Sequence, residues 1–260
     1  MSELINYEKV DNHIALLRLN RSEAANAMSK ALLDELNKYI AEIDLDSSIR
    51  CTIITGAGEK AFCAGADLKE RKGMTDNQVI QAVSYIGETI NNVAKLKMPV
   101  ISAINGVAFG GGLELALACD IRIAVNNTKV GLTETSLAII PGAGGTQRLT
   151  RLIGLGQAKR LIFTGKPISS EEALTVGLVE QLANQESLLN DAIEMASQIA
   201  KNGPVALRQA KSAIDQGIQT DLESGLVIEH QCYKETIPTS DRVEGLVAFK
   251  EKRKPLYKGQ

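Results

Sequence analysis

The sequence has few aromatic residues and almost no excess of charge of either sign. It contains no Trp, and Phe, Tyr and Trp together make up 3% of its 260 residues. The formal net charge is −2 at pH 7, which argues against a protein built to bind nucleic acid or another polyanion. The apolar fraction is ordinary, so we expect one large domain, or a domain with an appendage, whose core is aliphatic and rich in Ala and Gly.

Cysteine and histidine are scarce as well. The four cysteines are widely spaced and form no CxxC pair, so we expect reduced thiols rather than disulfides or a metal site. The two histidines, His13 and His230, are too few to favour a histidine-based catalytic triad or a histidine-ligated metal. We therefore predict no metal.

Signals for a membrane or for export are also missing. No apolar run is long enough to span a bilayer. The first six residues, Met1–Asn6, have neither the basic start nor the apolar stretch of an export signal. We therefore predict a cytoplasmic protein without a membrane partner.

The first half of the chain alternates strand-like and helix-like segments. Strands are predicted over 13–19, 51–55, 100–104 and 121–125, and helices over 29–43, 76–97 and 110–119. The strand over 121–125 is apolar throughout, which is typical of a strand buried on both faces. This alternation predicts an α/β fold with a largely parallel sheet.

The second half is predicted to be almost entirely helical. The expected helices span 146–153, 157–163, 170–176, 186–201, 205–216, 221–235 and 240–252. We therefore divide the chain into an α/β core over residues 1–200 and a helical C-terminal region over residues 201–260. The last helix is predicted to be amphipathic, so it must pack on its own core or on a neighbouring subunit.

Two glutamates stand among apolar residues and glycines. Glu114 follows the glycine triplet 110–112 and is surrounded by Leu and Ala, and Glu134 follows Gly131 and precedes a second glycine cluster. A carboxylate in apolar surroundings costs several kcal/mol of lost hydration unless something compensates. Two such carboxylates, each where backbone can approach a ligand, indicate paired acid/base chemistry.

The glycine triplet lies between a predicted strand and a predicted helix. A tight turn with close helix–strand packing would explain it equally well. Alternatively, the N–H groups at the start of the helix can bind a negative charge that develops on an oxygen. The segment 61–71 could supply a second N–H group, and Lys69 and Arg71 would offer positive charge to a phosphate. Taken alone, that segment is typical of a loop followed by a solvated helix face.

Other nucleotide and nucleophile motifs do not fit. Gly56-x-Gly58 follows a strand, but no helix comes after it as a dinucleotide-binding site requires. The chain has no GxxxxGK[ST] and no GxSxG sequence.

Three long motifs resemble the crotonase (enoyl-CoA hydratase/isomerase) family. They lie in Phe62–Lys69, Asn105–Leu115 and Glu134–Leu149, and the segments 20–27 and 248–253 also fit. The resemblance covers essentially the whole chain. Within the family, the segments 112–122 and 251–259 are most similar to the methylglutaconyl-CoA hydratase branch.

The resemblance implies a fold and a substrate class. The fold is a spiral of ββα units with a helical C-terminal region that builds homotrimers, which are commonly paired into hexamers. The substrates are acyl-CoA thioesters. No cofactor is implied, because coenzyme A is carried by the substrate.

The resemblance also implies site residues. Ala66 and Gly111 would supply the two N–H groups of an oxyanion hole, and Glu114 and Glu134 would be catalytic. The coenzyme A contacts would come from Ala64, Ala66, Asp67, Leu68, Lys69, Gly111, Phe249 and Lys252. Lys69 would lie near a phosphate, while Phe249 and Lys252 would approach from the C-terminal helix of the same or a neighbouring subunit. The acyl pocket would be lined by the segment 71–80 and by the helix face 85–90.

Because both glutamates are present, the chain resembles a hydratase that adds water across the 2,3 double bond of a short-chain or branched enoyl-CoA, as in fatty-acid or branched amino-acid breakdown. A double-bond isomerase, which needs only one base, is the first alternative. A non-enzymatic RNA-binding or scaffold protein is the second. The predicted helix 29–43 carries Lys30 and Lys38 but also Asp34, Glu35 and Glu42, so it is not a basic RNA-binding surface. The acyl group, the glutamate that holds the proton, and the choice between trimer and hexamer remain open.

Overall fold

The larger sheet forms the centre of the molecule. The computed structural model describes residues 3–260, and in it six strands pair in the order β1-β2-β3-β5-β7-β10. They span Ile5–Asp11 (β1), Ile14–Leu19 (β2), Cys51–Gly56 (β3), Val100–Ile104 (β5), Ile121–Val125 (β7) and Gln181–Ala183 (β10). From β2 to β10 the neighbours are parallel, and β1 adds an antiparallel edge. The predicted α/β class and parallel sheet are confirmed.

A smaller sheet follows the same repeat. Its strands are β4 (Ala61–Cys63), β6 (Val107–Phe109), β8 (Lys129–Gly131) and β9 (Ile168–Ser169), in that order. Each of β3, β5 and β7 is followed by a short strand of this second sheet and then by helical chain, so ββα units recur as the resemblance implied. None of these four short strands was predicted, because segments of two or three residues are too short to show strand periodicity.

The helices lie close to their predicted positions. They span Lys30–Leu45 (α1), Leu68–Arg71 (α2), Asp76–Ala94 (α3), Gly111–Leu117 (α4), Gly145–Ile153 (α5), Leu155–Thr164 (α6), Ser170–Thr175 (α7), Leu188–Ala200 (α8), Pro204–Gly217 (α9), Leu222–Thr236 (α10) and Ser240–Glu251 (α11). Short 3-10 turns cover Ser22–Ala24 (η1) and Glu134–Leu137 (η2). The predicted end of α3 at Lys97 is wrong: Lys95 caps the helix, because the chain must straighten before Pro99 to enter β5.

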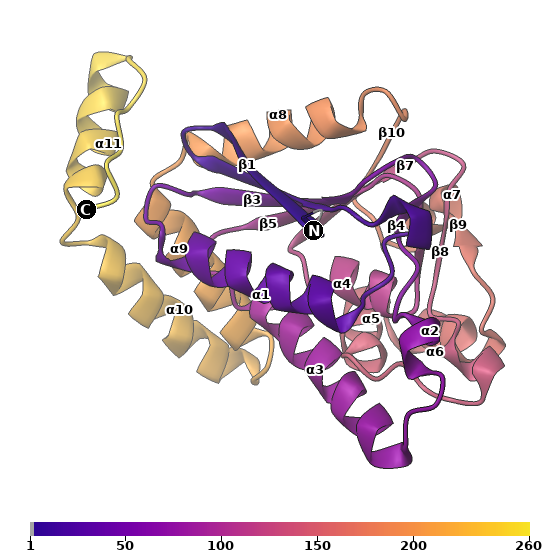
Figure 1. Cartoon of the computed structure of the whole chain (residues 1–260). Coiled ribbons are helices and arrows are strands. Elements are labelled where there is room, and N and C mark those ends of the chain that lie inside the picture. The colour runs from indigo at the N-terminus through magenta and orange to yellow at the C-terminus, as the bar shows by residue number, and fades with distance from the viewer. Residues whose placement is uncertain (1–2) are drawn as a thin grey trace.

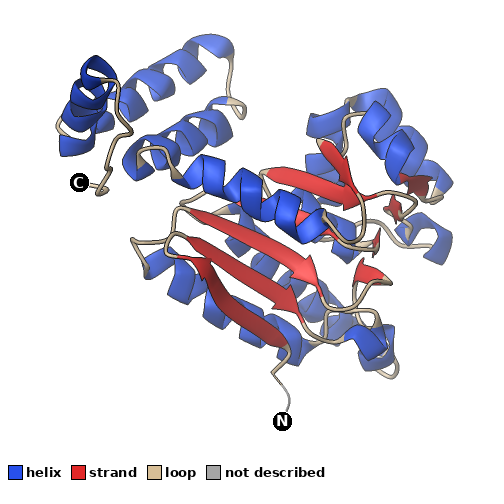
Figure 2. Ribbon diagram, turned by 90° about the horizontal axis from the view of Figure 1, so that it is seen from above, coloured by secondary structure: helices blue, strands red, loops and turns tan. Residues whose placement is uncertain are grey.

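Alternating residues of the larger sheet face two separate cores. On β2, Ile14 and Leu16 pack with α8, whereas Ala15, Leu17 and Leu19 belong to the cluster that includes α1, α3 and α4. Figure 1 shows α8 above the sheet and α1, α3 and α4 below it, and Figure 2 shows helices on both sides of the strands. Burial on both faces explains why the sequences of the parallel strands are continuous apolar runs.

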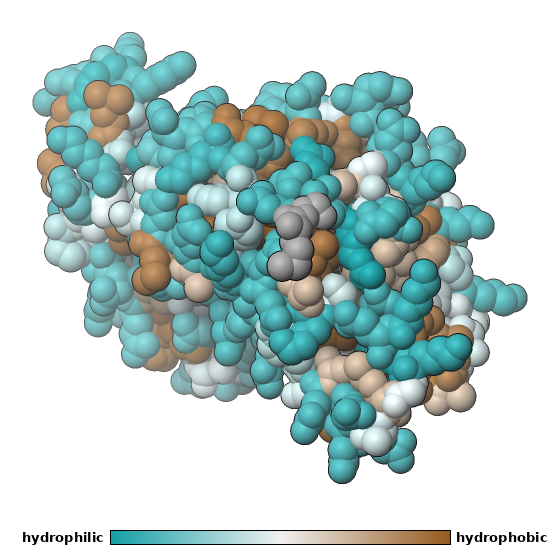
Figure 3. Space-filling view, in the orientation of Figure 1, coloured by the Kyte–Doolittle hydropathy of each residue, from teal (hydrophilic) through white to brown (hydrophobic). Residues whose placement is uncertain are grey.

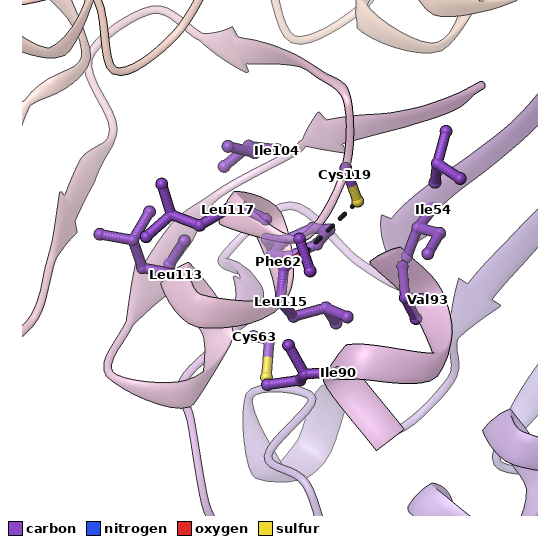
Figure 4. Close-up of a cluster of buried hydrophobic side chains, with 14 of the residues drawn as sticks. Ile54, Phe62, Cys63, Ile90, Val93, Ile104, Leu113, Leu115, Leu117 and Cys119 are labelled. Carbon is purple, nitrogen blue, oxygen red and sulfur yellow. Dashed lines mark hydrogen bonds between the residues drawn. The ribbon is translucent and has the colours of Figure 1, made fainter. Parts of the chain in front are cut away.

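The helix α4 is buried almost all round. Its side chains Leu113, Leu115 and Leu117 surround Phe62 of β4, which is fully buried at the centre of the cluster in Figure 4. A helix that is apolar on every side has no solvent face along which it could shift. The packing therefore fixes where α4 begins, at Gly111.

The C-terminal helices α9–α11 lie to one side of the sheet (Figure 1). They expose the apolar side chains of Ile214, Ile218, Leu222, Leu226, Val227, Tyr233, Val243, Leu246 and Phe249. In Figure 3, brown atoms lie among teal ones over this part of the molecule. The last helix is less amphipathic than predicted, because Arg242 and Lys250 interrupt its apolar side. The boundary between residues 1–200 and 201–260 stays a prediction, as does the subunit assembly. No helix within residues 3–260 has the length and apolarity needed to cross a membrane.

Close backbone packing against α4 generates a first prediction. A Cβ atom on Gly112 would lie 2.0 Å from the carbonyl oxygen of Cys63, so we expect Gly112→Ala to lower the free energy of unfolding by about 3 kcal/mol. On Gly156 of α6 a Cβ meets nothing within 4 Å, so Gly156→Ala should raise it by about 0.5–1 kcal/mol through helix propensity. Urea unfolding of both variants measures the difference, and equal stabilities would contradict the tight α4–β4 contact.

Candidate active site

Glu114 is held by the backbone of a neighbouring turn. It lies in the first part of α4 and is only 3% exposed. Its Oε1 atom accepts hydrogen bonds from the N–H groups of Ala143 and Gly145, both at 2.8 Å. A Cβ atom on Gly145 would lie 2.9 Å from the same oxygen, so the carboxylate can approach the start of α5 only because this residue is glycine.

Opposing effects act on the pKa of Glu114. Burial raises the pKa, whereas the two N–H groups and the charges of Arg148 and Arg71 lower it. Burial outweighs the other effects, and the pKa stays above its ordinary value. The two backbone donors nevertheless favour the ionised form, which suits a group that removes a proton from water.

Glu134 has different surroundings. It is half-buried in η2, so the interpretation that both glutamates are buried is right for Glu114 and only partly right here. Its Oε2 atom is buried and has no hydrogen-bond partner within the described chain. Burial raises the pKa of Glu134 to about 7, and the charge of Glu114 adds to the rise. An unpartnered buried oxygen favours the protonated form.

Both glutamates are associated with the first turn of α4. Glu114 belongs to α4 itself, and a Cβ atom on Gly110, the N-cap of α4, would lie 3.1 Å from Oε1 of Glu134. The charge of Glu114 is among the causes of the raised Glu134 pKa, which places the two groups within electrostatic reach. The structure thus brings together the two residues on which the predicted acid/base chemistry depends.

Two backbone N–H groups lie beside this helix start. Gly111 is the first residue of α4, so its N–H has no acceptor inside the helix. Neither it nor the N–H of Ala66 donates to another group of residues 3–260. A Cβ atom on Gly111 would lie 3.7 Å from the nitrogen of Ala66, and one on Gly65 would lie 3.3 Å from the nitrogen of Gly111. Adjacent unpaired amides of this kind can stabilise an oxyanion.

The loop that carries Ala66 is fixed on both sides. The N–H of Met28 donates to the carbonyl of Gly65 at 2.8 Å, and the N–H of Asp67 donates to the carbonyl of Met28 at 3.1 Å. The Asp67 carboxylate accepts from Arg21 at 2.6 Å and from the N–H of Lys69 at 2.8 Å. Burial raises the pKa of Asp67, but the bonds to Arg21 and Lys69 outweigh it and leave the pKa lowered.

Two arginines position this site and were not predicted to belong to it. Arg21 reaches Asp67, and Arg148 donates to the carbonyl of Ala143 at 3.1 Å and to Asn91 at 2.6 Å. Arg148 therefore links α3 to the turn that contains Ala143 and Gly145, the two residues whose N–H groups donate to Glu114. The motif around 20–27 was a signal for Arg21, whereas only the folded chain shows which carboxylate or carbonyl each arginine meets.

A cavity of about 330 Å³ begins at Ala66 and extends between α1, α2 and α3. Apolar side chains of Met28, Leu33, Met74 and Ile86 form much of its wall. The predicted segments 71–80 and 85–90 both contribute to this wall. Neither glutamate lines the cavity, whereas Ala66, whose amide lies next to that of Gly111, does.

The predicted coenzyme A contacts are only partly assembled in one chain. Ala64, Leu68 and Lys69 are exposed around α2, next to the cavity. Phe249, which is 85% exposed, and Lys252 lie at α11, at the other end of the molecule from α2 in Figure 1. One chain does not bring these two groups of residues together.

Candidate metal ligands do not cluster in residues 3–260: no three His, Cys, Asp or Glu side chains gather as a metal site requires. The four cysteines are buried and unpaired. Cys63 lies close to the loop that carries Ala66. Burial raises the pKa of its thiol to about 12, so the thiol stays protonated and unreactive.

Comparison with known proteins gives matches along the whole chain. The model of the enoyl-CoA hydratase/isomerase family matches residues 9–260. A Bacillus subtilis (strain 168) protein, YngF, which carries a provisional enoyl-CoA hydratase/isomerase name, is 55% identical over 259 residues, covering 100% of both chains. The mitochondrial methylglutaconyl-CoA hydratase of Homo sapiens is 49% identical over 257 residues, or 97% of this chain and 76% of that protein. The crystal structure of an enoyl-CoA hydratase from Bacillus anthracis has a TM-score of 0.98 at 56% identity and covers 99% of this chain and 100% of that one.

The ion pair behind Ala66 generates a prediction of stability. Arg21→Met would leave the buried Asp67 carboxylate without its cation, so we expect a loss of about 2–3 kcal/mol, somewhat less than for a fully buried pair. Because the pKa of Asp67 is lowered in the folded protein, this contribution is present above the unfolded-state pKa and is lost as pH falls through the folded-state value.

Urea unfolding at neutral and acidic pH measures this loss. Arg18→Met is the matched control, because Arg18 is half-buried and makes no ion pair within residues 3–260. The wild type and Arg21→Met should converge in stability at acidic pH. A difference that does not depend on pH would contradict an electrostatic role for the pair.

Proposed function

This chain belongs to the enoyl-CoA hydratase/isomerase family, as its motifs predicted, and we propose that it adds water across the 2,3 double bond of an enoyl-CoA thioester. One observation carries the proposal: Glu114 lies in the first turn of α4 and the carboxyl group of Glu134 approaches its N-cap, where two adjacent amides have no partner in the described chain. Hydration needs an acid, a base and a site for negative charge. This arrangement offers all three.

In the proposed reaction the thioester oxygen accepts hydrogen bonds from the N–H groups of Ala66 and Gly111. They stabilise the enolate-like oxygen that forms when water attacks the β-carbon, and one such donor is typically worth about 3–4 kcal/mol of transition-state stabilisation. Glu114 takes a proton from the attacking water. Glu134 gives a proton to the α-carbon. After one turnover Glu114 is protonated and Glu134 is ionised. Transfer of a proton from Glu114 to Glu134 restores the starting state.

The surroundings of the two glutamates support this division of roles. The base must be ionised, and Glu114 accepts two backbone N–H bonds that favour its charged form. The acid must hold a proton near neutral pH, and Glu134 has a pKa raised to about 7 with an unpartnered buried oxygen. Carboxyl pairs that interact in this way can share one proton.

An isomerase would need the same two amides and only one base. The family name covers both activities, and the second carboxyl group favours hydration. Product analysis with a 3-enoyl-CoA separates the two reactions. We propose no cofactor, because the substrate brings coenzyme A and both catalytic groups belong to the chain. A scaffold or RNA-binding role would not explain why two carboxyl groups are desolvated, since that desolvation is costly.

Coenzyme A is proposed to lie along Ala64–Lys69, with Lys69 near a phosphate. Phe249 and Lys252 would contribute from a neighbouring subunit, because α11 is remote from α2 within one chain. The apolar side chains exposed on α9–α11 would be covered in a homotrimer, alone or paired into a hexamer. Short-chain and branched enoyl-CoA thioesters are both candidate substrates, and the cytoplasm is the proposed location.

The two-carboxylate mechanism predicts the effect of neutral replacements. Glu114→Gln and Glu134→Gln should each lower kcat for crotonyl-CoA hydration by about 10²–10⁴-fold, because each removes one proton-transfer step. The loss of the conjugated thioester absorbance measures the rate, and equilibrium binding of coenzyme A should survive in both.

Glu186→Gln is the control for these variants, since Glu186 is exposed and precedes α8. It should hydrate crotonyl-CoA at the wild-type rate. Near-normal turnover by either active-site variant would rule out the proposed roles.

The raised pKa values predict a bell-shaped pH profile of kcat/KM. Glu134 must be protonated to act as the acid, so the rate should fall as pH rises through about 7. Glu114 must be ionised to act as the base, and its raised pKa should make the rate fall on the acid side. Glu134→Gln should lack the alkaline decline. A wild-type rate that stays constant well above neutral pH would contradict Glu134 as the acid.

A further inference from the structure

The helix α11 buries very little of its own surface. Of its 12 residues, only Asp241 and Ala248 are buried. Asp241 is 6% exposed, although its neighbours Ser240 and Arg242 both face solvent. A buried carboxylate needs hydrogen-bond donors, so the donors to Asp241 show which part of the chain is attached to α11.

The donors come from the segment 253–260, which we call the strap. It follows α11 and runs back along that helix in Figure 1. One oxygen of Asp241 accepts a hydrogen bond from the N–H of Lys258 at 2.7 Å, and the other accepts one from the N–H of Gly259 at 2.8 Å. These two charge-assisted bonds offset the loss of water around the carboxylate.

A second carboxylate of α11 holds the other half of the strap. Glu244 lies about one turn after Asp241 and accepts two hydrogen bonds from the side chain of Arg253, at 2.6 and 2.9 Å. It also accepts one from the N–H of Leu256 at 2.8 Å. The side chain of Glu244 is more exposed than Asp241, so water weakens its ion pair. Asp241 is therefore the main attachment of the strap to α11.

The strap also reaches the larger sheet, through Arg50. This arginine directly precedes β3 and is half-buried. Its guanidinium donates to the carbonyl of Tyr257 at 2.8 Å and to the carbonyl of Ala200, the last residue of α8, at 3.0 Å. A cation in that place also favours the C-terminal end of α8. One side chain thus connects the strap to the sheet and to α8.

Arg50 and Asp241 lie on opposite sides of the strap and influence each other. Burial lowers the pKa of Arg50, and the charge of Asp241 opposes that change. The two side chains are therefore within electrostatic reach, and residues 257–259 are bonded to one or the other. A Cβ atom on Gly259 would lie 3.0 Å from Cγ of Pro204, so the strap also passes close to the start of α9.

We propose that the strap fixes α11 to the rest of the chain, and that Arg50 and Asp241 are positioning residues for the binding of coenzyme A. This inference rests on the proposed function, in which α11 brings Phe249 and Lys252 to the coenzyme A of a neighbouring subunit. A helix with a single buried apolar residue gains too little from burial to hold its own position. Loss of the strap would let α11 move and leave the two glutamates and the two amides in place.

Hydrogen–deuterium exchange tests the strap independently of activity. Arg50→Met removes both carbonyl contacts, and Asp241→Asn leaves one acceptor oxygen for two N–H groups. In either variant the amides of α11 should exchange about 10- to 100-fold faster, which is the factor that a hydrogen bond to a charged group typically contributes. The amides of α10 should exchange as they do in the wild type.

Steady-state kinetics test the link to coenzyme A. In both variants KM for crotonyl-CoA should rise about 3- to 10-fold, because the fraction of chains with α11 in position falls. The value of kcat should stay within about twofold of the wild type, since the reacting groups are untouched. A general loss of folded enzyme would lower kcat instead.

Two matched variants serve as controls. Arg208 lies within electrostatic reach of Arg50 and donates to the carbonyl of Ser47, so Arg208→Met removes a similar contact outside the strap. Glu223 is an exposed acid in the first turn of α10, as Asp241 is an acid in the first turn of α11. Glu223→Gln therefore shows the effect of losing such a charge alone. Neither control should change the exchange of α11 or KM.

Two results would overturn the inference. The first is exchange of α11 that is unchanged in both Arg50→Met and Asp241→Asn, because other contacts would then hold the helix. The second is faster exchange with an unchanged KM, which would separate α11 from coenzyme A binding. A wild type that does not hydrate crotonyl-CoA would refute the proposed hydration instead, and the dissociation constant of coenzyme A would then replace KM in the comparison. If Arg50→Met does not fold, Asp241→Asn decides.

Discussion

The close approach of α4 to the loop after β4 is the constraint on which the site depends. A side chain at Gly112 would meet the backbone of Cys63, and a side chain at Gly65 would meet the carbonyl of Phe109 at 2.9 Å. Only glycine permits both contacts. They bring the N–H groups of Ala66 and Gly111 side by side, and the apolar burial of α4 around Phe62 (Figure 4) keeps them there. The chemistry proposed for the site therefore begins with backbone packing.

The same packing gives two chemically identical side chains different surroundings. Glu114 accepts hydrogen bonds from two N–H groups of a turn, and Arg148 links that turn to α3. Glu134 lies in η2, and one of its oxygens is buried without a hydrogen-bond partner among residues 3–260. The two N–H donors favour the carboxylate form of Glu114, although burial raises its pKa overall, whereas the surroundings of Glu134 favour the carboxylic acid. On the opposite side, the ion pair of Arg21 and Asp67 steadies the amide of Ala66.

Much of the architecture could be predicted from the chain alone, because its signals are local. Ser29 caps α1 as predicted, the apolar side of that helix is buried, and β5 and β7 lie where continuous apolar runs indicated strands. The short strands of the smaller sheet were missed, since three residues carry no periodicity. The end of α3 was placed too late, because the helical pattern continues past the point where the chain must turn into β5.

Most helices, the central parallel strands, the glycine positions and the two candidate glutamates can be recognised in the chain alone, because these depend on composition and spacing within short segments. The fold alone establishes which groups meet: that Arg21 reaches Asp67 across 46 positions of sequence, that Arg148 supports the turn at Glu114, and that Arg71 lines the cavity beside Ala66. It also left α11, the helix that carries Phe249, far from α2 within one chain (Figure 1). Such contacts join residues that are distant along the chain, and only the packing of sheets and helices brings them within hydrogen-bonding range.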